Sequence, residues 1–421
     1  NELSNQLVND RPRYGLQRVD GVDLMPLCKD RIGLKQVGVR LGYSHLEELP
    51  YEPGATLSPN EIATTRAYNI HDLKITTQLY DELSQPLALR RLLSERYEVD
   101  LRSASDAEMG DKVIVSEYQR ETGLSKKDLI RMAQDNNRES VQFQPPSWIE
   151  YLDDESLIAN LAEQWAERVA PLERKDTPQG ATYKLPGKTI SPYQGIVAIG
   201  DRSYTTGTGG LHSIDGPGCW YPNDQRTLWH IDVTSYYPAT ILNHELAPRH
   251  MDAEVFLEIF RKLVDQRLVA KREGDIQTAN ALKIVINSVY GKLGSWYSPW
   301  LDFQQQLQVV LTGQIALLWL IERLEQTDTA HVLSANTDGL VVAVLDLEGF
   351  QKVTREWEEL TSYSLEHTAL QLFAQTDVNN YTLVTQEGHI KAVGTLDQES
   401  SLRKNPNNRI ITEAIIQQLT T

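Results

Sequence analysis

The ten residues from Trp229 to Pro238, WHIDVTSYYP, constrain the fold more than any other stretch of this chain. The run begins with apolar residues and then presents Asp232, followed by Ser235, two tyrosines and a proline. A carboxylate at the end of an apolar strand costs free energy unless it meets a cation. We therefore expect a strand that leads to Asp232, a turn that carries the tyrosines, and other residues that complete a site around this carboxylate.

Length and composition limit the class of protein. A chain of 421 residues is long for a single core, so two or more domains are expected. The net charge of −17 argues against a protein that coats itself with nucleic acid but leaves a local basic groove open. The two cysteines, Cys28 and Cys219, exclude a disulfide framework and a multi-cysteine zinc site, and favour a cytoplasmic setting. We find no run of 18 apolar residues and no signal-peptide pattern.

The first part of the chain, residues 1 to about 85, is expected to belong to an α/β domain. Residues 20–27, DGVDLMPL, are interpreted as a short strand. A helix is predicted from the Ser58-Pro59 start past Tyr80. On this helix Tyr68 and Asp72 stand four residues apart and share one face, which on local grounds indicates a surface pair.

The pattern changes near residue 186 to short strands with tight turns. Gly209 and Gly210 lie within GTGGLHS, where the backbone can approach a ligand, although a hairpin turn is the more common meaning. Further on, HVLSANTDGLVVAVLD predicts two buried strands joined by a turn at Asn336–Gly339. Asp338 is either a bare turn aspartate or a carboxylate held at the sheet edge to meet Asp232.

Residues 252–291 predict two helices separated by Gly274 and ended by Gly291, an αα-hairpin. Lys283, Asn287 and Tyr290 are spaced by four and three residues, so they share one helical face. Arg267 and Lys271 lie one turn apart on the other helix, and an antiparallel hairpin turns the two faces toward each other. Such a cationic cluster suits a polyphosphate, and the alternative is a solvated basic helix. Residues 303–326 predict an apolar core helix.

Several stretches together resemble the motifs of family B DNA polymerases. DVTSYYP, which begins at Asp232, resembles the first palm motif D-x-x-S-L-Y-P. KIVINSVYG, which begins at Lys283, resembles the fingers motif K-x-x-x-N-S-x-Y-G. NTDG, which begins at Asn336, resembles the second palm motif D-T-D-S, and the three stretches occur in the family's order. GTGGLHS looks like the Gly-Gly motif, and Lys391 to Gly394 like the K-x-K-G motif with Val393 for the second Lys. Tyr68 and Asp72 resemble the third proofreading-exonuclease motif. The resemblance covers roughly residues 20 to 400.

The resemblance implies an α+β fold: a right-hand polymerase palm, which is an antiparallel sheet with helices, and a helical fingers hairpin. Part of a ribonuclease H-like α/β exonuclease domain would precede them. The expected divisions are residues 1–90 for the partial exonuclease, 91–185 for a connecting helical region, 186–254 and 297–396 for the palm, 255–296 for the fingers, and 397–421 for the start of a thumb.

The implied activity is template-directed DNA synthesis with two Mg²⁺ or Mn²⁺ ions, primer-template DNA and dNTPs. Asp232, Asp338 and the Val233 carbonyl would hold the metals, and Lys283 would also protonate the leaving group. The implied nucleotide-binding residues are Ser235, Tyr236, Tyr237, Arg267, Lys271, Asn287 and Tyr290, with Tyr237 excluding a 2′-hydroxyl. The implied DNA-binding residues are Gly209, Gly210, Lys391 and Gly394.

The chain departs from the family pattern in ways that shape these expectations. Asn336 stands where the motif has its first Asp, and Tyr236 replaces an aliphatic residue. We find no exonuclease motif upstream of Tyr68, and we expect no 3′–5′ exonuclease because one carboxylate cannot hold two metals. We also expect weak processivity. The chain is expected to be a fragment, or one piece of a split, phage-like polymerase that a second polypeptide completes. Its expected location is the host cytoplasm.

Two other functions stay open at this stage. The first is a catalytically inactive nucleic-acid-binding module that keeps the polymerase fold. The second is a hydrolase that uses two carboxylates, which leaves the helix carrying Lys283, Asn287 and Tyr290 unexplained.

Overall fold

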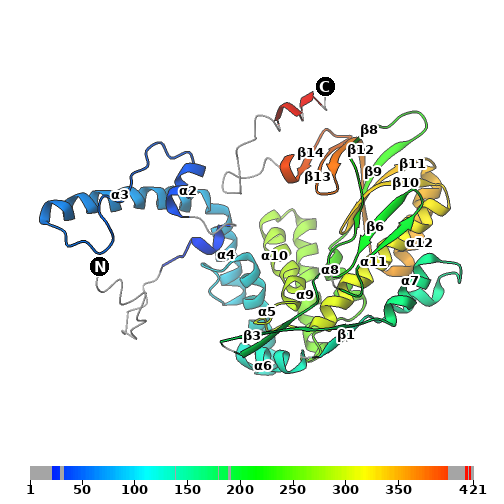
Figure 1. Cartoon of the computed structure of the whole chain (residues 1–421), viewed down its shortest axis with the longest axis horizontal. Coiled ribbons are helices and arrows are strands. Elements are labelled where there is room, and N and C mark those ends of the chain that lie inside the picture. Colours follow the sequence, from blue (N-terminus) through cyan, green and yellow to red (C-terminus); the bar gives the residue numbers. More distant parts are fainter. Residues whose placement is uncertain are drawn as a thin grey trace. The chain divides into compact units, whose positions relative to one another are not determined.

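The computed structural model describes residues 21–28, 33–137, 139–178, 180–187, 191–396, 413–415 and 417–418. Contacts divide the chain into two compact units, with the boundary between Ser105 and Asp106 (Figure 1). The six-part division expected from the sequence stays a prediction. The first twenty residues of the expected exonuclease part, and nearly all of the expected thumb at residues 397–421, lie outside the described residues.

The described part of the smaller unit is helical. It contains η2 (Met25–Leu27), α2 (Leu34–Arg40), α3 (Pro59–Glu82) and α4 (Ser84–Tyr97). The predicted start of α3 is confirmed, because Ser58 and Glu61 form a capping box that satisfies two backbone N–H groups. Five buried residues form its core: Leu24, Val37, Leu79, Leu83 and Leu87.

Two expectations for this unit are wrong. The strand expected within residues 20–27 is a single 3₁₀ turn, because Pro26 fixes φ and has no N–H for a sheet. Between residues 21 and 105 the described residues contain no strand, so the α/β architecture expected there is not found.

The larger unit combines helices with an antiparallel sheet. Its helices are α5 (Asp106–Thr122), α6 (Lys126–Asn136), η3 (Ser147–Tyr151), α7 (Leu157–Ala166), α8 (Tyr236–Asn243), α9 (Ala253–Glu273), α10 (Ile276–Leu293), α11 (Phe303–Gln326), α12 (Leu347–Thr361) and η4 (Gly394–Leu396). Its strands are β1 (Ser140–Gln142), β2 (Val169–Pro171), β3 (Glu173–Thr177), β4 (Gly180–Lys184), β5 (Gly195–Ile199), β6 (Arg202–Thr206), β7 (His212–Ser213), β8 (Gly218–Trp220), β9 (Thr227–Val233), β10 (Ala330–Asn336), β11 (Gly339–Val344), β12 (Leu365–Asp377), β13 (Asn380–Thr385) and β14 (Ile390–Val393). The region expected to be a helical connection, residues 91–185, also carries the pairs β1–β2 and β3–β4.

The main sheet has the order β14-β13-β12-β9-β11-β10-β7-β6-β5, and β8 pairs with β12. Strand β9, which contains Asp232, therefore lies in the middle between β11 and β12. Alternate residues of β9 face opposite sides. Ile231 and Val233 belong to the main core with α11, whereas Leu228 belongs to a smaller cluster on the other side.

Helix α11 spans the predicted residues and is the main core helix. It is long and apolar enough to cross a membrane by length and composition, but 94% of its apolar window is buried inside the protein. A helix that is apolar on all sides is expected either in a core or in a membrane, and here the sheet and α7, α8 and α12 contact it.

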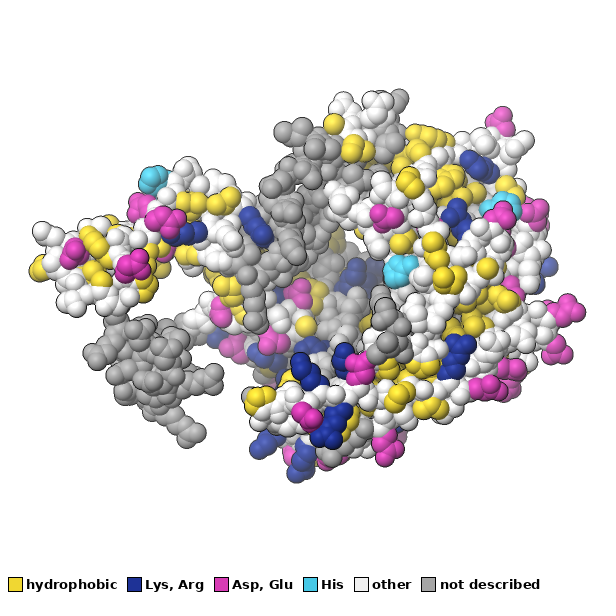
Figure 2. All heavy atoms as spheres, viewed as in Figure 1, with side chains coloured by type: hydrophobic (Ala, Val, Ile, Leu, Met, Phe, Trp, Pro, Cys, Tyr) yellow, Lys and Arg dark blue, Asp and Glu magenta, His cyan; other side chains and the backbone are white. Residues whose placement is uncertain are grey.

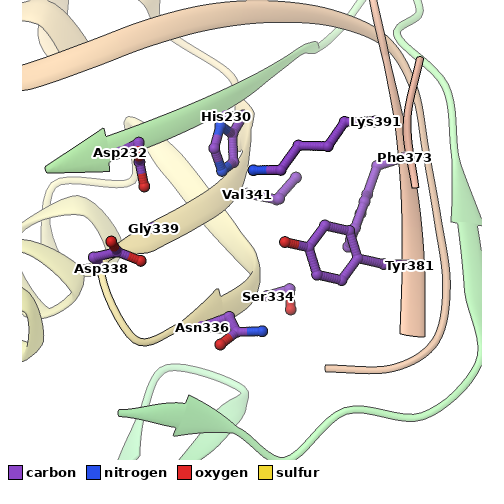
Figure 3. Close-up of a pocket in the computed structure, with 10 residues that line it drawn as sticks. All are labelled: His230, Asp232, Ser334, Asn336, Asp338, Gly339, Val341, Phe373, Tyr381 and Lys391. Atoms are coloured by element: carbon purple, nitrogen blue, oxygen red, sulfur yellow. The ribbon is translucent and has the colours of Figure 1, made fainter. Parts of the chain in front are cut away.

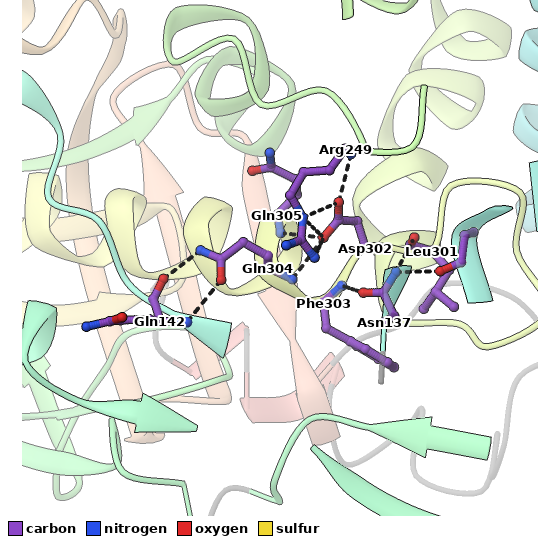
Figure 4. Close-up of polar contacts among 9 residues, drawn as sticks. Asn137, Gln142, Arg249, Leu301, Asp302, Phe303, Gln304 and Gln305 are labelled. Atoms are coloured by element: carbon purple, nitrogen blue, oxygen red, sulfur yellow. Dashed lines mark hydrogen bonds and ion pairs between the residues drawn. The ribbon is translucent and has the colours of Figure 1, made fainter. Parts of the chain in front are cut away.

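Polar contacts fix the N-terminal end of α11 (Figure 4). Asp302 caps the helix, and its buried carboxylate also pairs with Arg249 at 2.9 Å. The side chain of Gln304 accepts a hydrogen bond from the Gln142 N–H and donates one to the Gln142 carbonyl. The Gln304 amide thus pairs with both backbone polar groups of Gln142, and these hydrogen bonds hold β1 against α11.

Helices α9 and α10 form the predicted hairpin, with Gly274 at φ 75° between them. Gly291 does not end α10, which continues to Leu293 and is followed by Gly294. Helix α5 packs against α10 so closely that a Cβ on Gly110 would lie 1.6 Å from Ser288 Oγ. The packing of α5 against this hairpin was not expected from the sequence.

Candidate active site

The structure brings Asp232 and Asp338 together at the ends of two paired strands. Asp232 on β9 lies opposite Gly339, the first residue of β11. The Val233 N–H donates a hydrogen bond of 2.9 Å to the Asp338 carbonyl. Both carboxylates line one pocket, and Figure 3 shows them pointing toward one another. The hypothesis that Asp338 is more than a bare turn residue thus agrees with its position.

The turn that carries Asp338 is held by specific backbone and side-chain contacts. Thr337 adopts a left-handed conformation at φ 60°, and the Asp338 N–H donates to the Asn336 carbonyl at 2.8 Å. The Asn336 amide donates to the Val378 carbonyl at 2.7 Å, which an ionised aspartate could not do. Asn336 therefore anchors the turn to the loop between β12 and β13.

The two carboxylates share an unfavourable environment. Burial, and after it the charge of Asp338, raises the pKa of Asp232 to about 6. Burial also raises the pKa of Asp338, while Lys391 and Lys283 oppose the shift. A third acid, Glu366, lies directly opposite Asp232 on β12. A nearby cation stabilises the ionised form of carboxyl groups in such positions.

The donor set fits a hard divalent cation in part. Within the described residues no three His, Cys, Asp or Glu side chains are arranged to hold a metal ion. Mg²⁺ commonly takes one or two carboxylates and completes its shell with water and substrate phosphates. Asp232 and Asp338 fit this pattern. The Val233 carbonyl as a further ligand stays a prediction.

The raised pKa predicts how stability depends on pH and metal. The folded pKa of Asp232, about 6, exceeds its ordinary value of 3.8, so its contribution to the free energy of unfolding falls as pH rises from about 4 to about 6. Above pH 7 and without divalent ions, Asp232→Asn is expected to be more stable than wild type by about 1 to 2 kcal/mol after screening.

Chemical denaturation at pH 4 and pH 7.5 measures this difference, which should nearly vanish at pH 4. Mg²⁺ should stabilise wild type more than the variant, because the variant lacks one anionic ligand. A variant less stable than wild type at pH 7.5 without metal would contradict the electrostatic interpretation.

Cationic side chains of the α9–α10 hairpin lie on the side of the carboxylates. Arg267 donates a hydrogen bond of 2.7 Å to Ser235 Oγ, and Ser235 itself has the left-handed φ of 52°. Lys271 contacts Glu366 at 3.5 Å. Lys283 is exposed and close enough to act on the pKa of both aspartates. The structure thus gathers the three cations that the sequence singled out.

The tyrosines after Asp232 have different surroundings. Tyr237 stacks on Tyr290 of α10, with ring centroids 3.7 Å apart and planes at 11°. Tyr236 is buried against α11, where a Cβ on Gly313 would lie 2.2 Å from its hydroxyl. Asn287 is exposed on α10. Contact with a nucleotide stays a prediction for all of these residues.

The glycine loop from Gly207 to Gly210 lies beside the Asp338 turn. A Cβ on Gly210 would lie 2.5 Å from Thr337 Oγ1, and the Thr337 N–H donates to the Leu211 carbonyl at 2.7 Å. Gln314, nearly fully buried on α11, accepts from the Gly207 N–H and donates to the carbonyls of Gly207 and Gly209. Sequence reasoning missed Gln314, although an amide directly before the apolar run Ile315–Ile321 of a core helix was a usable signal.

Replacing Gln314 by Leu is expected to lower the free energy of unfolding by about 2 to 4 kcal/mol. The change leaves backbone groups of the loop buried without partners. Chemical denaturation measures the loss. Gln305→Leu, half-buried on the same helix, is the matched control and should change stability little. Equal stability of the two variants would show that Gln314 does not hold the loop.

The pocket extends from the carboxylates over the sheet. Its empty volume is about 370 Å³, open solvent at its mouth included. Besides the aspartates it is lined by His230, Ser334, Asn336, Gly339, Val341, Phe373, Tyr381 and Lys391. Figure 3 shows Lys391 reaching toward His230 and the Tyr381 hydroxyl pointing into the pocket. Burial, and then Lys391, lowers the pKa of His230 to about 4.

The predicted DNA-binding residue Gly394 and the predicted exonuclease residues Tyr68 and Asp72 have other surroundings. Gly394 has φ 75°, and a Cβ there would lie 2.3 Å from the Asn379 carbonyl, so packing alone accounts for this glycine. Tyr68 and Asp72 lie on α3 of the smaller unit. The Nζ of Lys35 is 5.8 Å from the Tyr68 ring centroid, and Lys35 also pairs with Glu48. These contacts form a surface cluster with no assigned role.

No protein-family model matches the chain, and a search of the curated proteins finds no match. Among the solved structures that match is the family B DNA polymerase from the hyperthermophilic archaeon Pyrobaculum calidifontis. The match has a TM-score of 0.39 and 16% identity and covers 91% of this chain. This chain spans 48% of that one, about half its length. A similarity this low carries no argument about function.

Proposed function

We propose that this chain is a template-directed DNA polymerase, which transfers a nucleotide from a dNTP to a primer 3′-hydroxyl and releases pyrophosphate. One observation carries the proposal. Asp232 and Asp338, which come from two stretches that resemble palm motifs, converge on paired strands beside the cationic α9–α10 hairpin. Phosphoryl transfer between nucleotides needs this combination of carboxylates for cations and positive side chains for phosphates.

Different residues of the chain would bind cations, neutralise phosphate charge and donate a proton. Asp232 and Asp338 would hold divalent cations, which supply activation of the primer hydroxyl and stabilisation of the leaving pyrophosphate when bound. Lys283, Arg267 and Lys271 would neutralise the triphosphate. Lys283 would also give a proton to the leaving pyrophosphate, because an ammonium can release one and a guanidinium cannot.

Tyr237 would bound the sugar of the incoming nucleotide. Its stacking on Tyr290 fixes the ring orientation, so the space for a 2′-hydroxyl is set by two rings rather than one. Asn287, one turn before Tyr290 on α10, would line the pocket of the new base pair. These roles rest on the resemblance and on the proximity of α8 to α10.

DNA contact is expected to be local. On the face shown in Figure 2, acidic and basic side chains are interspersed, in line with a net charge of −17. Lys391 at the pocket, and the Gly209–Gly210 backbone beside the Asp338 turn, would meet the DNA strands near the primer terminus. Affinity that depends on few phosphate contacts should fall only moderately with salt.

Incubation with a 5′-labelled primer on a longer template, Mg²⁺ and all four dNTPs tests the proposal. A polymerase lengthens the primer only when the template is present. A hydrolase using the two carboxylates would shorten it. An inactive binding module would retain the DNA in a gel-shift assay and leave its length unchanged with Mg²⁺ and with Mn²⁺. Either of the last two results would refute the proposal.

A further inference from the structure

Helix α5 packs against both helices of the α9–α10 hairpin, and the sequence motifs give it no role (Figure 1). Its polar contacts lie near the base of the hairpin, where the chain enters α9 and leaves α10. Tyr118, nearly fully buried, accepts a hydrogen bond of 2.8 Å from the N–H of Asp252, the N-cap residue of α9. Asp111 contacts Lys292 in the last turn of α10. Helix α5 therefore holds both ends of the hairpin.

Asp111 is a buried carboxylate with two partners at this base. It is 3% exposed, and its Oδ1 accepts a hydrogen bond of 2.8 Å from the indole N–H of Trp300. Its Oδ2 lies 3.1 Å from Lys292 Nζ. Trp300 is itself fully buried and packs on Phe256 of α9. Removal of one partner of a buried ion pair leaves the other charge uncompensated, so the pair favours a single placement of the end of α10.

Gly110 allows α5 to approach α10 closely. A Cβ at this position would lie 1.6 Å from Ser288 Oγ and 2.7 Å from the Val285 carbonyl oxygen. The serine hydroxyl can rotate away, but the carbonyl belongs to the backbone of α10. A side chain at residue 110 must therefore move one helix away from the other.

The residues that α5 contacts lie on the face of α10 opposite the expected nucleotide-binding face. At about 3.6 residues per turn, Ser288 and Lys292 share one face of the helix. The opposite face carries Lys283, Asn287 and Tyr290. The position of α5 thus sets how far the nucleotide-binding face projects toward the carboxylates.

The stack of Tyr290 on Tyr237 depends closely on the placement of α10. The ring centroids are 3.7 Å apart and the planes meet at 11°, so the rings are in van der Waals contact. A shift of α10 by about 1 Å would press the rings together or part them, with loss of much of this contact. Because Tyr237 is the residue proposed to exclude a 2′-hydroxyl, its orientation depends on α10 and, through α10, on α5.

We propose that Gly110 and Asp111 are positioning residues for sugar selection. They fix α10 from the face opposite the site, hold Tyr290 against Tyr237, and so set the preference for a deoxyribonucleotide over a ribonucleotide. This assignment rests on the proposed polymerase function and extends it to a helix outside the site. Neither residue is expected to touch the nucleotide.

Incorporation of a single dNTP and of the matching rNTP tests the assignment. With the whole chain, kcat/KM is measured for both nucleotides, and the ratio of the two values is compared between proteins. Gly110→Ala should lower the ratio by about tenfold or more, because a displacement of about 1 Å misplaces the ring that excludes the hydroxyl. Asp111→Asn keeps an oxygen acceptor for Trp300 but loses the ion pair, and should lower the ratio by about threefold.

Two further variants separate sugar selection from a purely structural role. Gln119→Ala is the matched control, because Gln119 is exposed and lies half a turn round α5 from Gly110, and its ratio should equal that of wild type. Adding Lys292→Met to Asp111→Asn should restore the ratio, because it removes the charge left without a partner.

A purely structural role lowers kcat/KM for both nucleotides by the same factor. An unchanged ratio in Gly110→Ala and Asp111→Asn would therefore overturn the inference, as would a wild type that incorporates both nucleotides equally well. If Gly110→Ala does not fold, the ratio in Asp111→Asn decides alone. Failure of wild type to extend any primer would instead overturn the proposed function, and the inference with it.

Discussion

Asp338→Asn is expected to lower primer extension by about 10³-fold or more, while binding of primer-template DNA changes by less than about threefold. The variant keeps the shape of the turn but replaces one of two anionic oxygen ligands by a neutral amide. DNA binding should survive because Lys391 and the Gly209–Gly210 loop do not depend on the charge of Asp338. Affinity for divalent ions should fall, because only Asp232 retains a full negative charge.

Single-turnover extension and fluorescence anisotropy with labelled DNA measure the two quantities separately. Asp265→Asn is the matched control, since it removes the same charge from an exposed position on α9. It should extend primers like wild type. Extension by Asp338→Asn at the rate of Asp265→Asn would show that the paired carboxylates are not the catalytic centre.

Lys283→Ala is expected to lower kcat for dNTP incorporation by about 10² and to raise the KM for the dNTP, because it removes both a phosphate contact and a proton donor. Lys283→Arg separates the two roles. A guanidinium keeps the charge but does not release a proton, so the KM should stay near that of wild type while kcat remains low.

Steady-state incorporation of one nucleotide gives kcat and KM for these variants. Lys262→Ala, exposed on α9, removes an equal charge and should leave both constants unchanged. If Lys283→Arg restores the wild-type kcat, Lys283 acts through its charge alone. If Lys283→Ala matches Lys262→Ala, Lys283 does not contact the triphosphate.

The elements that carry the expected site could be predicted because their signals are local. The turn at Asn336–Gly339 combines Asn and Gly with apolar flanks, and the hairpin is broken by a glycine that takes a positive φ. Helix α11 and strand β9 follow from hydrophobic runs. The meeting of Asp232 with Asp338 came from the order of the motifs, and the pairing of β9 with β11 agrees with it.

Other parts of the site have no local signal. Glu366 contributes to the site because the strand register places it opposite Asp232. Gln314 contributes because its side chain hydrogen-bonds the glycine loop. His230 looked like one residue of a strand until the pocket on its face was known. Such partners come from distant segments, and single-sequence periodicity does not encode register.

The failed expectations have similar causes. Residues 20–27 looked like a strand from their apolar content, but Pro26 favours a turn. Gly291 was taken as a helix end, yet an isolated glycine is tolerated inside a helix that packs well, and α10 runs on to Leu293. The α/β expectation for the first unit combined that strand with the helix from Ser58-Pro59, and its described residues are helical.

Templated single-nucleotide incorporation tests whether Asp232 and Asp338 form the centre of a DNA polymerase. Four primer-templates that differ only in the first templating base are each offered one dNTP at a time with Mg²⁺, for wild type and Asp338→Asn in parallel. Wild type is expected to add the complementary nucleotide in each case, whereas the variant adds none on the same time scale. Addition that ignores the template, or equal addition by both proteins, would contradict it.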